Sequence, residues 1–262
     1  MGVFQGPKRA LLVTLSVLLF FFVAAATGPL HAEERLRQDL PPVIMGYMDF
    51  PPLMWDDKGI PRGELIELAK EIAEQQGFEI KFVMRPVNRL YKDVAEGKIH
   101  VWVGSPFTST VAGKVLFKNP AVVVAELRLW ALKGKPIPEL DNIVDQPLIV
   151  RRGYKYGGRF DGLAAPTRGL KLVAAGSHAD IFDLLRARRA LYALDYQRPA
   201  TISNNEEEKA MEHFHSRLVE EFPSYFNVSK KAPNAERILG LFHQGLIAVR
   251  ASDEAAEIKS AR

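Results

Sequence analysis

The chemistry that this sequence can support is concentrated in loops that follow short apolar runs. The loop 104–110 comes directly after the apolar run 99–103, whose β-branched content favours a buried strand. In that loop Ser105 and Thr108 offer hydroxyl groups, and a helix starting just beyond them would add N–H donors and positive potential for a polar ligand. Ordinary helix capping uses the same residue types and remains the alternative.

Aromatic side chains near the expected strand ends suit the wall of a binding pocket. Phe50 lies in a loop after the apolar segment 43–45, where its ring could stack on a planar or aliphatic ligand. The alternative for this ring is packing beneath Pro51 and Pro52. Trp102 could line the same pocket, although core packing explains a tryptophan in mid-strand equally well.

The second half of the chain adds a tyrosine and an aspartate. Tyr154, next to Gly153, could close over a ligand or shape a turn. Asp195 follows the apolar run 190–194 and could pair with an amino group, although an aspartate after a strand is often a helix cap. Arginines that could anchor an anion, although most arginines are solvated, are Arg85, Arg89 and Arg152. The ligand-binding residues that we predict are Phe50, Trp102, Ser105, Thr108, Tyr154, Asp195 and Arg89.

The sequence predicts no catalytic residue, no metal site and no cofactor. The chain has no cysteine, which excludes a disulfide framework, a thiolate zinc site and a cysteine nucleophile. His213 and His215 are spaced i, i+2 on an expected helix, which would point their rings apart. Neither a glycine-rich phosphate loop nor a nucleophile elbow is present in the sequence.

Residues 1–32 have the composition of a secretory signal peptide. Lys8 and Arg9 precede an apolar run over 10–26, and Ala32 is a small residue at which a signal peptidase would cut. The alternative is an uncleaved anchor helix, since the apolar run is nearly long enough to span a membrane. A cleaved, cysteine-free chain is expected to be a monomer in the bacterial periplasm.

The charge balance gives no support for a nucleic-acid partner. The chain has 35 Lys and Arg residues against 31 Asp and Glu residues, and both Lys8 and Arg9 belong to the expected signal peptide. The remainder is nearly neutral, and it contains no basic stripe with interleaved aromatic residues. We therefore expect no nucleic acid among the partners.

Two successive α/β units are expected to position the candidate residues. Apolar residues at helical spacing over 64–76, stopped by Gly77, predict a helix, and alternation over 78–84 predicts a strand. The other elements expected in the first unit are strands at 43–45 and 99–103 and a short helix that Asn88 caps and Gly97 ends. After a long apolar run at 121–132, the second unit is expected to contain strands at 148–150, 172–173 and 190–194, a helix to about Arg188 opened by a Ser177–Asp180 capping box, helices at 205–221 and 234–249, and an extended piece at 226–229.

Segments in this order resemble the family 3 periplasmic solute-binding proteins, the receptors of polar amino acid ABC importers and their relatives. The segments that carry the resemblance are 46–52, 63–70, 96–100, 117–121, 150–154, 190–196 and 226–230. The resemblance implies an α/β, bilobal periplasmic binding protein-like fold in which two α/β lobes are joined by two crossover strands. It assigns residues 41–122 and the return segment 226–262 to lobe 1, and residues 123–225 to lobe 2.

The resemblance implies a receptor whose lobes close on a small polar solute, with hinges near residues 121–127 and 222–226. Its partners would be a small-molecule ligand and the membrane permease of an ABC importer. Two alternatives remain: a ligand-sensing module without transport, and a dehydratase-like enzyme on the same fold. The enzyme would need a carboxylate or a histidine in the cleft, for which the candidates are Asp49, Glu64 and His100.

The sequence departs from this family at the group that binds a carboxylate. In the amino acid receptors an arginine grips the α-carboxylate of the ligand, and Val111 stands at the matching position here. Asp195 remains where the family pairs with an ammonium group. We therefore expect an amino acid-like or related solute bound without the usual clamp, and Arg89 is the substitute cation to test first.

Overall fold

The structure is a computed structural model that describes residues 40–202 and 212–260. Contacts within the chain separate residues 1–41 from residues 42–262, and every element named below belongs to the second unit. The expected signal peptide at residues 1–32 lies outside the described residues. In the described part of the chain, no helix has the length and apolar character needed to cross a membrane.

The first half of the unit is a parallel α/β arrangement around β1 (Val43–Tyr47). This strand lies between β4 (Ile80–Met84) and β5 (Val101–Gly104). Its helices are α3 (Glu64–Gln76), which buries the predicted apolar face and ends at left-handed Gly77, and α4 (Val87–Glu96). A hairpin of β2 (Trp55–Asp57) and β3 (Ile60–Arg62) precedes α3.

The second half repeats this arrangement around β8 (Pro147–Arg151), which pairs in parallel with β9 (Lys171–Ala175) and β10 (Tyr192–Tyr196). Helix α6 (His178–Arg186) begins at the predicted capping box, in which both reciprocal bonds are present. Its inner face packs Phe182 against Trp130 and Phe214. The short helices of this half are η1 (Leu140–Asn142), η2 (Tyr156–Gly158), α5 (Arg159–Leu163), η3 (Pro166–Arg168) and α7 (Gln197–Ile202).

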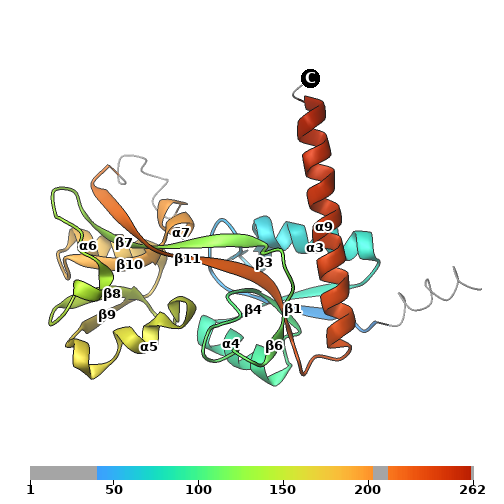
Figure 1. Ribbon diagram of the computed structural model, residues 1–262, viewed down its shortest axis with the longest axis horizontal. Coiled ribbons are helices and arrows are strands. Elements are labelled where there is room, and N and C mark those ends of the chain that lie inside the picture. Colours follow the sequence, from blue (N-terminus) through green and yellow to red (C-terminus); the bar gives the residue numbers. More distant parts are fainter. Residues whose placement is uncertain (1–39, 203–211, 261–262) are drawn as a thin grey trace, which may run out of the picture. The chain divides into compact units, whose positions relative to one another are not determined.

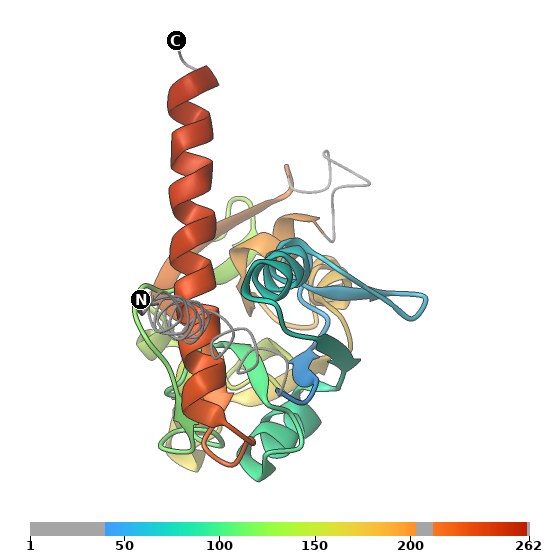
Figure 2. The ribbon, with the colours of Figure 1, turned by 90° about the vertical axis from the view of Figure 1, so that its right-hand side faces the viewer.

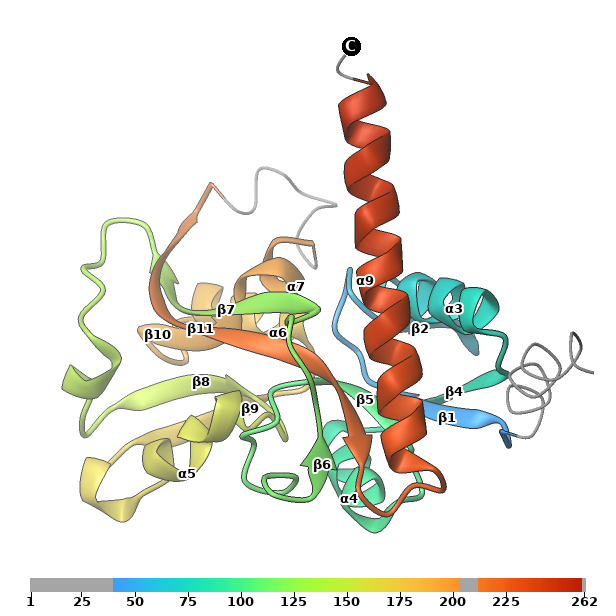
Figure 3. The ribbon, with the colours of Figure 1, turned by 45° about the vertical axis from the view of Figure 1, so that its right-hand side comes forward.

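Two long antiparallel strands connect the halves. Figures 1 and 3 show β7 (Val123–Leu132) and β11 (Phe214–Ser229) side by side. β7 also pairs with β10, whereas β11 continues past β7 to pair with β5 and with β6 (Val115–Leu116). The strand order β4-β1-β5-β11-β7-β10-β8-β9 is therefore continuous. This confirms the predicted bilobal α/β fold with two crossover strands.

One predicted helix is wrong. The sequence predicts a helix over 205–221, but residues 214–221 belong to β11. Residues 205–211 of that predicted helix lie outside the residues that the structure describes. The strand is held by its pairing with β7, a partner far away in the sequence, which overrides local helical preference. The argument that placed His213 and His215 on a helix fails with it, and the Nε2 of His215 instead lies 2.8 Å from the carbonyl oxygen of Lys135.

Three smaller predictions at helix ends also need correction. No helix begins after β5, because residues 106–114 form turns in which the carbonyl of Thr108 accepts two backbone N–H groups. Asn88 is not the cap of α4, since Pro86 occupies that position and Asn88 lies inside the helix. The closing helix α9 (Ala235–Ser260) continues beyond Val249, and Figure 2 shows its C-terminal part extending past the other elements.

A buried histidine fixes the approach of β1 to the start of β5. The Nδ1 of His100 accepts the backbone N–H of Ile44 at 3.1 Å, so this nitrogen has to be unprotonated. Burial lowers the pKa of His100 from its ordinary value of 6.5. The folded state therefore binds a proton here less readily than the unfolded chain does.

We expect the free energy of unfolding to fall as the pH drops below about 6.5, with His100 contributing to the loss. Above that pH the histidine is neutral in both states, and on acidification only the unfolded chain takes up the proton. His100→Asn keeps an acceptor for Ile44 but cannot titrate, so urea denaturation at several pH values should show a flatter pH dependence between about 6.5 and 5. An identical slope in the variant would contradict this assignment.

Candidate functional site

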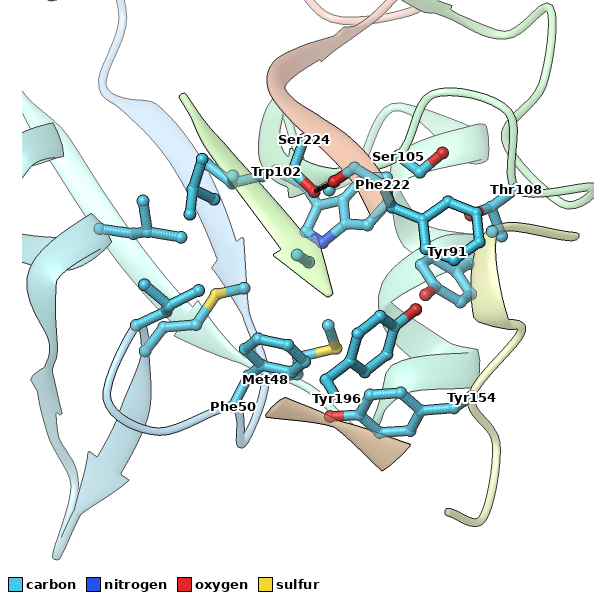
Figure 4. Close-up of a pocket in the computed structure, with 18 residues that line it drawn as sticks. Met48, Phe50, Tyr91, Trp102, Ser105, Thr108, Tyr154, Tyr196, Phe222 and Ser224 are labelled. Atoms are coloured by element: carbon cyan, nitrogen blue, oxygen red, sulfur yellow. Dashed lines mark hydrogen bonds between the residues drawn. The ribbon is translucent and has the colours of Figure 1, made fainter. Parts of the chain in front are cut away.

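A pocket lies between the two halves, at the carboxyl ends of the parallel strands β1, β5 and β10. Figure 4 shows the 18 residues that line it. Six of them are aromatic and come from both halves and from β11: Phe50, Tyr91, Trp102, Tyr154, Tyr196 and Phe222. The crevice beyond the strand ends is where open α/β sheets bind ligands, which makes this pocket the candidate site.

The loop after β1 places Phe50 against side chains of the other half. Hydrogen bonds between the backbones of Phe50 and Met54 close this loop. The ring of Phe50 meets Tyr196 edge-on, with centroids 5.3 Å apart, and stacks on Tyr154 at 6.2 Å. Gly63 allows the loop to pack on the start of α3, since a Cβ there would lie 2.4 Å from the Leu53 carbonyl oxygen.

The opposite wall consists of β5, the turn that follows it, and α4. Trp102 lies 5.1 Å from Tyr91 in an edge-to-face contact. Tyr91 makes a hydrogen bond with Thr108, and burial raises the pKa of this tyrosine. Ser105 and Thr108 are both buried and line the pocket with Ser224 of β11. The wall therefore presents hydroxyl groups and an indole N–H among apolar groups.

A chain of hydrogen bonds leads from a buried carboxylate to the far side of the pocket. Both oxygens of Asp195, which is 0% exposed, lie 2.8–2.9 Å from Nδ1 of His178. Because a carboxylate only accepts, Nδ1 carries a hydrogen. The hydroxyl of Tyr154 donates its one hydrogen to the carbonyl of Asp49 at 2.9 Å. It therefore accepts from Nε2 of His178 at 3.2 Å, so that both ring nitrogens carry a hydrogen and the ring faces the Asp195 carboxylate as its counter-charge. Tyr154 therefore joins the second half to the loop after β1.

A neighbouring tyrosine supports the loop that carries Tyr154. The hydroxyl of Tyr156 accepts the N–H of Arg151 and donates to the carbonyl of Leu194. Burial raises the pKa of Tyr154, Tyr156 and Tyr196, so all three hydroxyls stay protonated at neutral pH. These tyrosines offer neutral hydroxyl groups and no negative charge.

Five of the seven predicted ligand-binding residues line this pocket, namely Phe50, Trp102, Ser105, Thr108 and Tyr154. The other two are placed elsewhere. Arg89 is 56% exposed and its Nε donates to Asp93 at 2.8 Å, while the carboxylate of Asp195 faces His178. The lining residues Met48, Tyr91, Tyr196, Phe222 and Ser224 were not among the predicted ligand-binding residues, and Tyr196 directly follows the predicted Asp195.

None of the residues that line the pocket is charged or a histidine. The three groups considered for catalysis lie outside the lining: Glu64 pairs with Arg198, His100 binds Ile44, and Asp49 lies 3.8 Å from Arg151. Within residues 40–202 and 212–260, no group of three or more His, Asp or Glu residues is arranged to hold a metal ion. The pocket walls offer binding contacts of neutral groups only.

A model of the bacterial extracellular solute-binding proteins, family 3, matches residues 43–261. Comparison with curated proteins gives no match. The solved structures that resemble this chain include a histidine kinase sensor domain with similarity to periplasmic binding proteins, which has a TM-score of 0.68, 20% identity and coverage of 84% of this chain and 94% of that one.

Two further solved structures share the fold at similarly low sequence identity. An ancestral arginine-binding protein bound to arginine has a TM-score of 0.64 and 20% identity, over 83% of this chain and 96% of that one. The substrate binding protein of an amino acid ABC transporter has a TM-score of 0.62 and 18% identity, with the same two coverages of 83% and 96%. At such identities the likeness establishes the fold.

We expect His178→Leu to lower the free energy of unfolding by roughly 3–5 kcal/mol, because it leaves the buried carboxylate of Asp195 without its partner. Replacing both residues by leucine should recover much of that loss, since no uncompensated charge remains. Urea denaturation measures both effects. Asp183→Ala, on the exposed side of α6, is the control and should change the stability by less than about 0.5 kcal/mol. A double variant no more stable than His178→Leu would contradict the pairing.

Proposed function

We propose that this chain, which belongs to the family 3 bacterial extracellular solute-binding proteins, captures a small solute in the aromatic pocket and closes its two halves around it. The observation that carries the proposal is the lining of the pocket. Phe50 and Trp102 come from the first half, Tyr154 and Tyr196 from the second, and Phe222 from the strand that links them. A solute in this pocket contacts all three parts at once.

Such shared contacts favour closure on energetic grounds. A solute that touches both halves binds the closed form more tightly than any open form, so it shifts the equilibrium toward closure. The bond from Tyr154 to Asp49 and the ion pair between Arg198 and Glu64 are contacts between the halves that opening would break.

We place the hinges at residues 121–127 and 222–226, where β7 and β11 pass between the halves. With these hinges, residues 41–122 and 226–262 form lobe 1 and residues 123–225 form lobe 2. The ligand contacts that we propose are Phe50, Trp102, Ser105, Thr108 and Tyr154. Asp195 acts as a positioning residue, because it orients His178 and through it the hydroxyl of Tyr154.

In the cell, we propose a periplasmic receptor that delivers its solute to the permease of an ABC importer. The resemblance to the substrate binding protein of an amino acid ABC transporter supports this role. Ligand sensing is the second candidate, supported by the resemblance to a histidine kinase sensor domain. Genes for permease and ATPase subunits beside the gene for this chain would favour transport, and a neighbouring sensor kinase without them would favour sensing.

Filling the pocket should abolish solute binding. Ala125 of β7 lines the pocket, whereas the adjacent Val124 is exposed on the other face of the strand. A thermal-shift screen of small metabolites should find a solute that, at about 100 times its dissociation constant, adds roughly 2.7 kcal/mol of stability. Ala125→Leu should remove that stabilisation, and Val124→Leu should retain it.

Small-angle scattering of the wild-type chain should show a smaller radius of gyration with the same solute bound, because closure brings the halves together. Two results would overturn the proposal. One is a solute that binds Ala125→Leu as tightly as the wild type, and the other is saturation of the wild type without any compaction.

A further inference from the structure

The indole N–H of Trp102 is a buried hydrogen-bond donor without an acceptor among the described residues. The side chain is 1% exposed and lines the pocket. Indole nitrogen can only donate, and a buried donor left unpaired is destabilising because it has lost its hydrogen bonds to water. Native proteins rarely leave such a group unpaired. Figure 4 shows this nitrogen facing the space beside Phe50, Met48 and Tyr196.

Packing fixes the direction of this N–H. The ring of Trp102 lies on the backbone of Gly104, where an added Cβ would come within 2.0 Å of the indole Cζ2. Tyr91 holds the ring from the side at 5.1 Å. The indole cannot swing away to a protein acceptor without displacing these neighbours. A molecule in the pocket is therefore placed to supply the missing acceptor.

The walls of the pocket disfavour an ion. Two charged groups near the pocket lie outside its lining. Asp195 is bound to His178, and the guanidinium of Arg151, 5.6 Å from the centroid of the Tyr154 ring and 3.8 Å from Asp49, lines a neighbouring pocket. An ionised solute in this pocket would lose its hydration and meet no counter-charge among the lining residues. Aromatic walls also suit a quaternary ammonium ion. Trp102, however, presents its N–H edge to the pocket, and this positive edge opposes a cation.

From these observations, and resting on the proposed function, we infer that the solute is uncharged and largely apolar, and that it carries a carbonyl oxygen or ring nitrogen that accepts the N–H of Trp102. The body of such a solute packs on the rings of Phe50 and Tyr196. The hydroxyls of Ser105, Thr108 and Ser224 line the same pocket. Each already makes one hydrogen bond within the protein, with the N–H of Phe107, with Tyr91 and with the carbonyl of Phe222. Trp102 is then a specificity-determining residue, and zwitterionic amino acids are excluded.

Matched sets of probes that differ only in charge test this inference. One set is nicotinamide, nicotinate and 1-methylnicotinamide, and others pair a neutral amide with its carboxylate and its trimethylammonium analogue on benzene, indole and hexane frames. Calorimetry and thermal shift should detect binding of neutral members in at least one set and none of their ionic counterparts. The inference would be overturned if an ionic member bound more tightly than its neutral counterpart, or if no neutral member bound.

Trp102→Phe separates the hydrogen bond from the bulk of the ring. It should raise the dissociation constant of the neutral probe that carries an acceptor by about threefold to tenfold, which corresponds to the loss of one hydrogen bond. It should leave the binding of the parent hydrocarbon, which has no acceptor, unchanged. Trp55→Phe, outside the pocket lining, is the matched control and should leave both dissociation constants unchanged. Equal loss of both probes in Trp102→Phe would show that only packing is involved.

The outcomes also distinguish this inference from the proposed function. If a charged solute binds the wild type and Ala125→Leu abolishes that binding, the pocket still binds solute, but the inference that the solute is uncharged is refuted. If a neutral probe binds Ala125→Leu as tightly as the wild type, the solute binds outside the pocket. This result would refute both the proposed function and the inference about the solute.

Discussion

The pairing of β7 with β11 is the constraint on which the rest of the structure depends. The ladder runs from Val123 and Ser224 at one end to Leu132 and Phe214 at the other, and β11 then continues into the sheet of the first half. Because one strand serves both halves, the carboxyl ends of their parallel strands face a common space. The same ladder supplies part of the pocket wall through Val123, Ala125, Phe222 and Ser224. Architecture and binding site are therefore set by one set of backbone hydrogen bonds.

The neutrality of the pocket results from how nearby charges are paired. Asp93 accepts hydrogen bonds from both Arg85 and Arg89, and Asp195 is bound to His178. Val111 is buried in the turn after β5. The two charged residues that were predicted to contact a ligand, Arg89 and Asp195, are thus engaged with other side chains. What remains facing the pocket are rings, hydroxyls and one indole N–H.

The sequence predicts the fold well where local patterns decide the structure. The helical spacing before Gly77 and the capping box at Ser177 each correspond to observed elements. The helix expected at 214–221 is wrong because its strand conformation depends on β7, which no local pattern reveals. Asp195 was predicted as a ligand contact from the family resemblance and Arg89 as a substitute cation. The structure places them beside His178 and Asp93, which the sequence does not show. Tyr91 and Phe222 look like core residues in the sequence, and only the three-dimensional arrangement brings them to the pocket.

The hydrogen bond from Tyr154 to the carbonyl of Asp49 has a kinetic consequence. It joins the two halves beside the pocket, and the ring of Tyr154 stacks on Phe50 at the same place. In the proposed receptor, a solute enclosed behind these rings would leave only after the halves separate, so its residence time would follow the opening rate of the protein. Solutes of different affinity would then differ in how long they keep the halves together. In the proposed receptor, exchange with the surroundings would then be limited by the protein motion that breaks this hydrogen bond and the ion pair between Arg198 and Glu64.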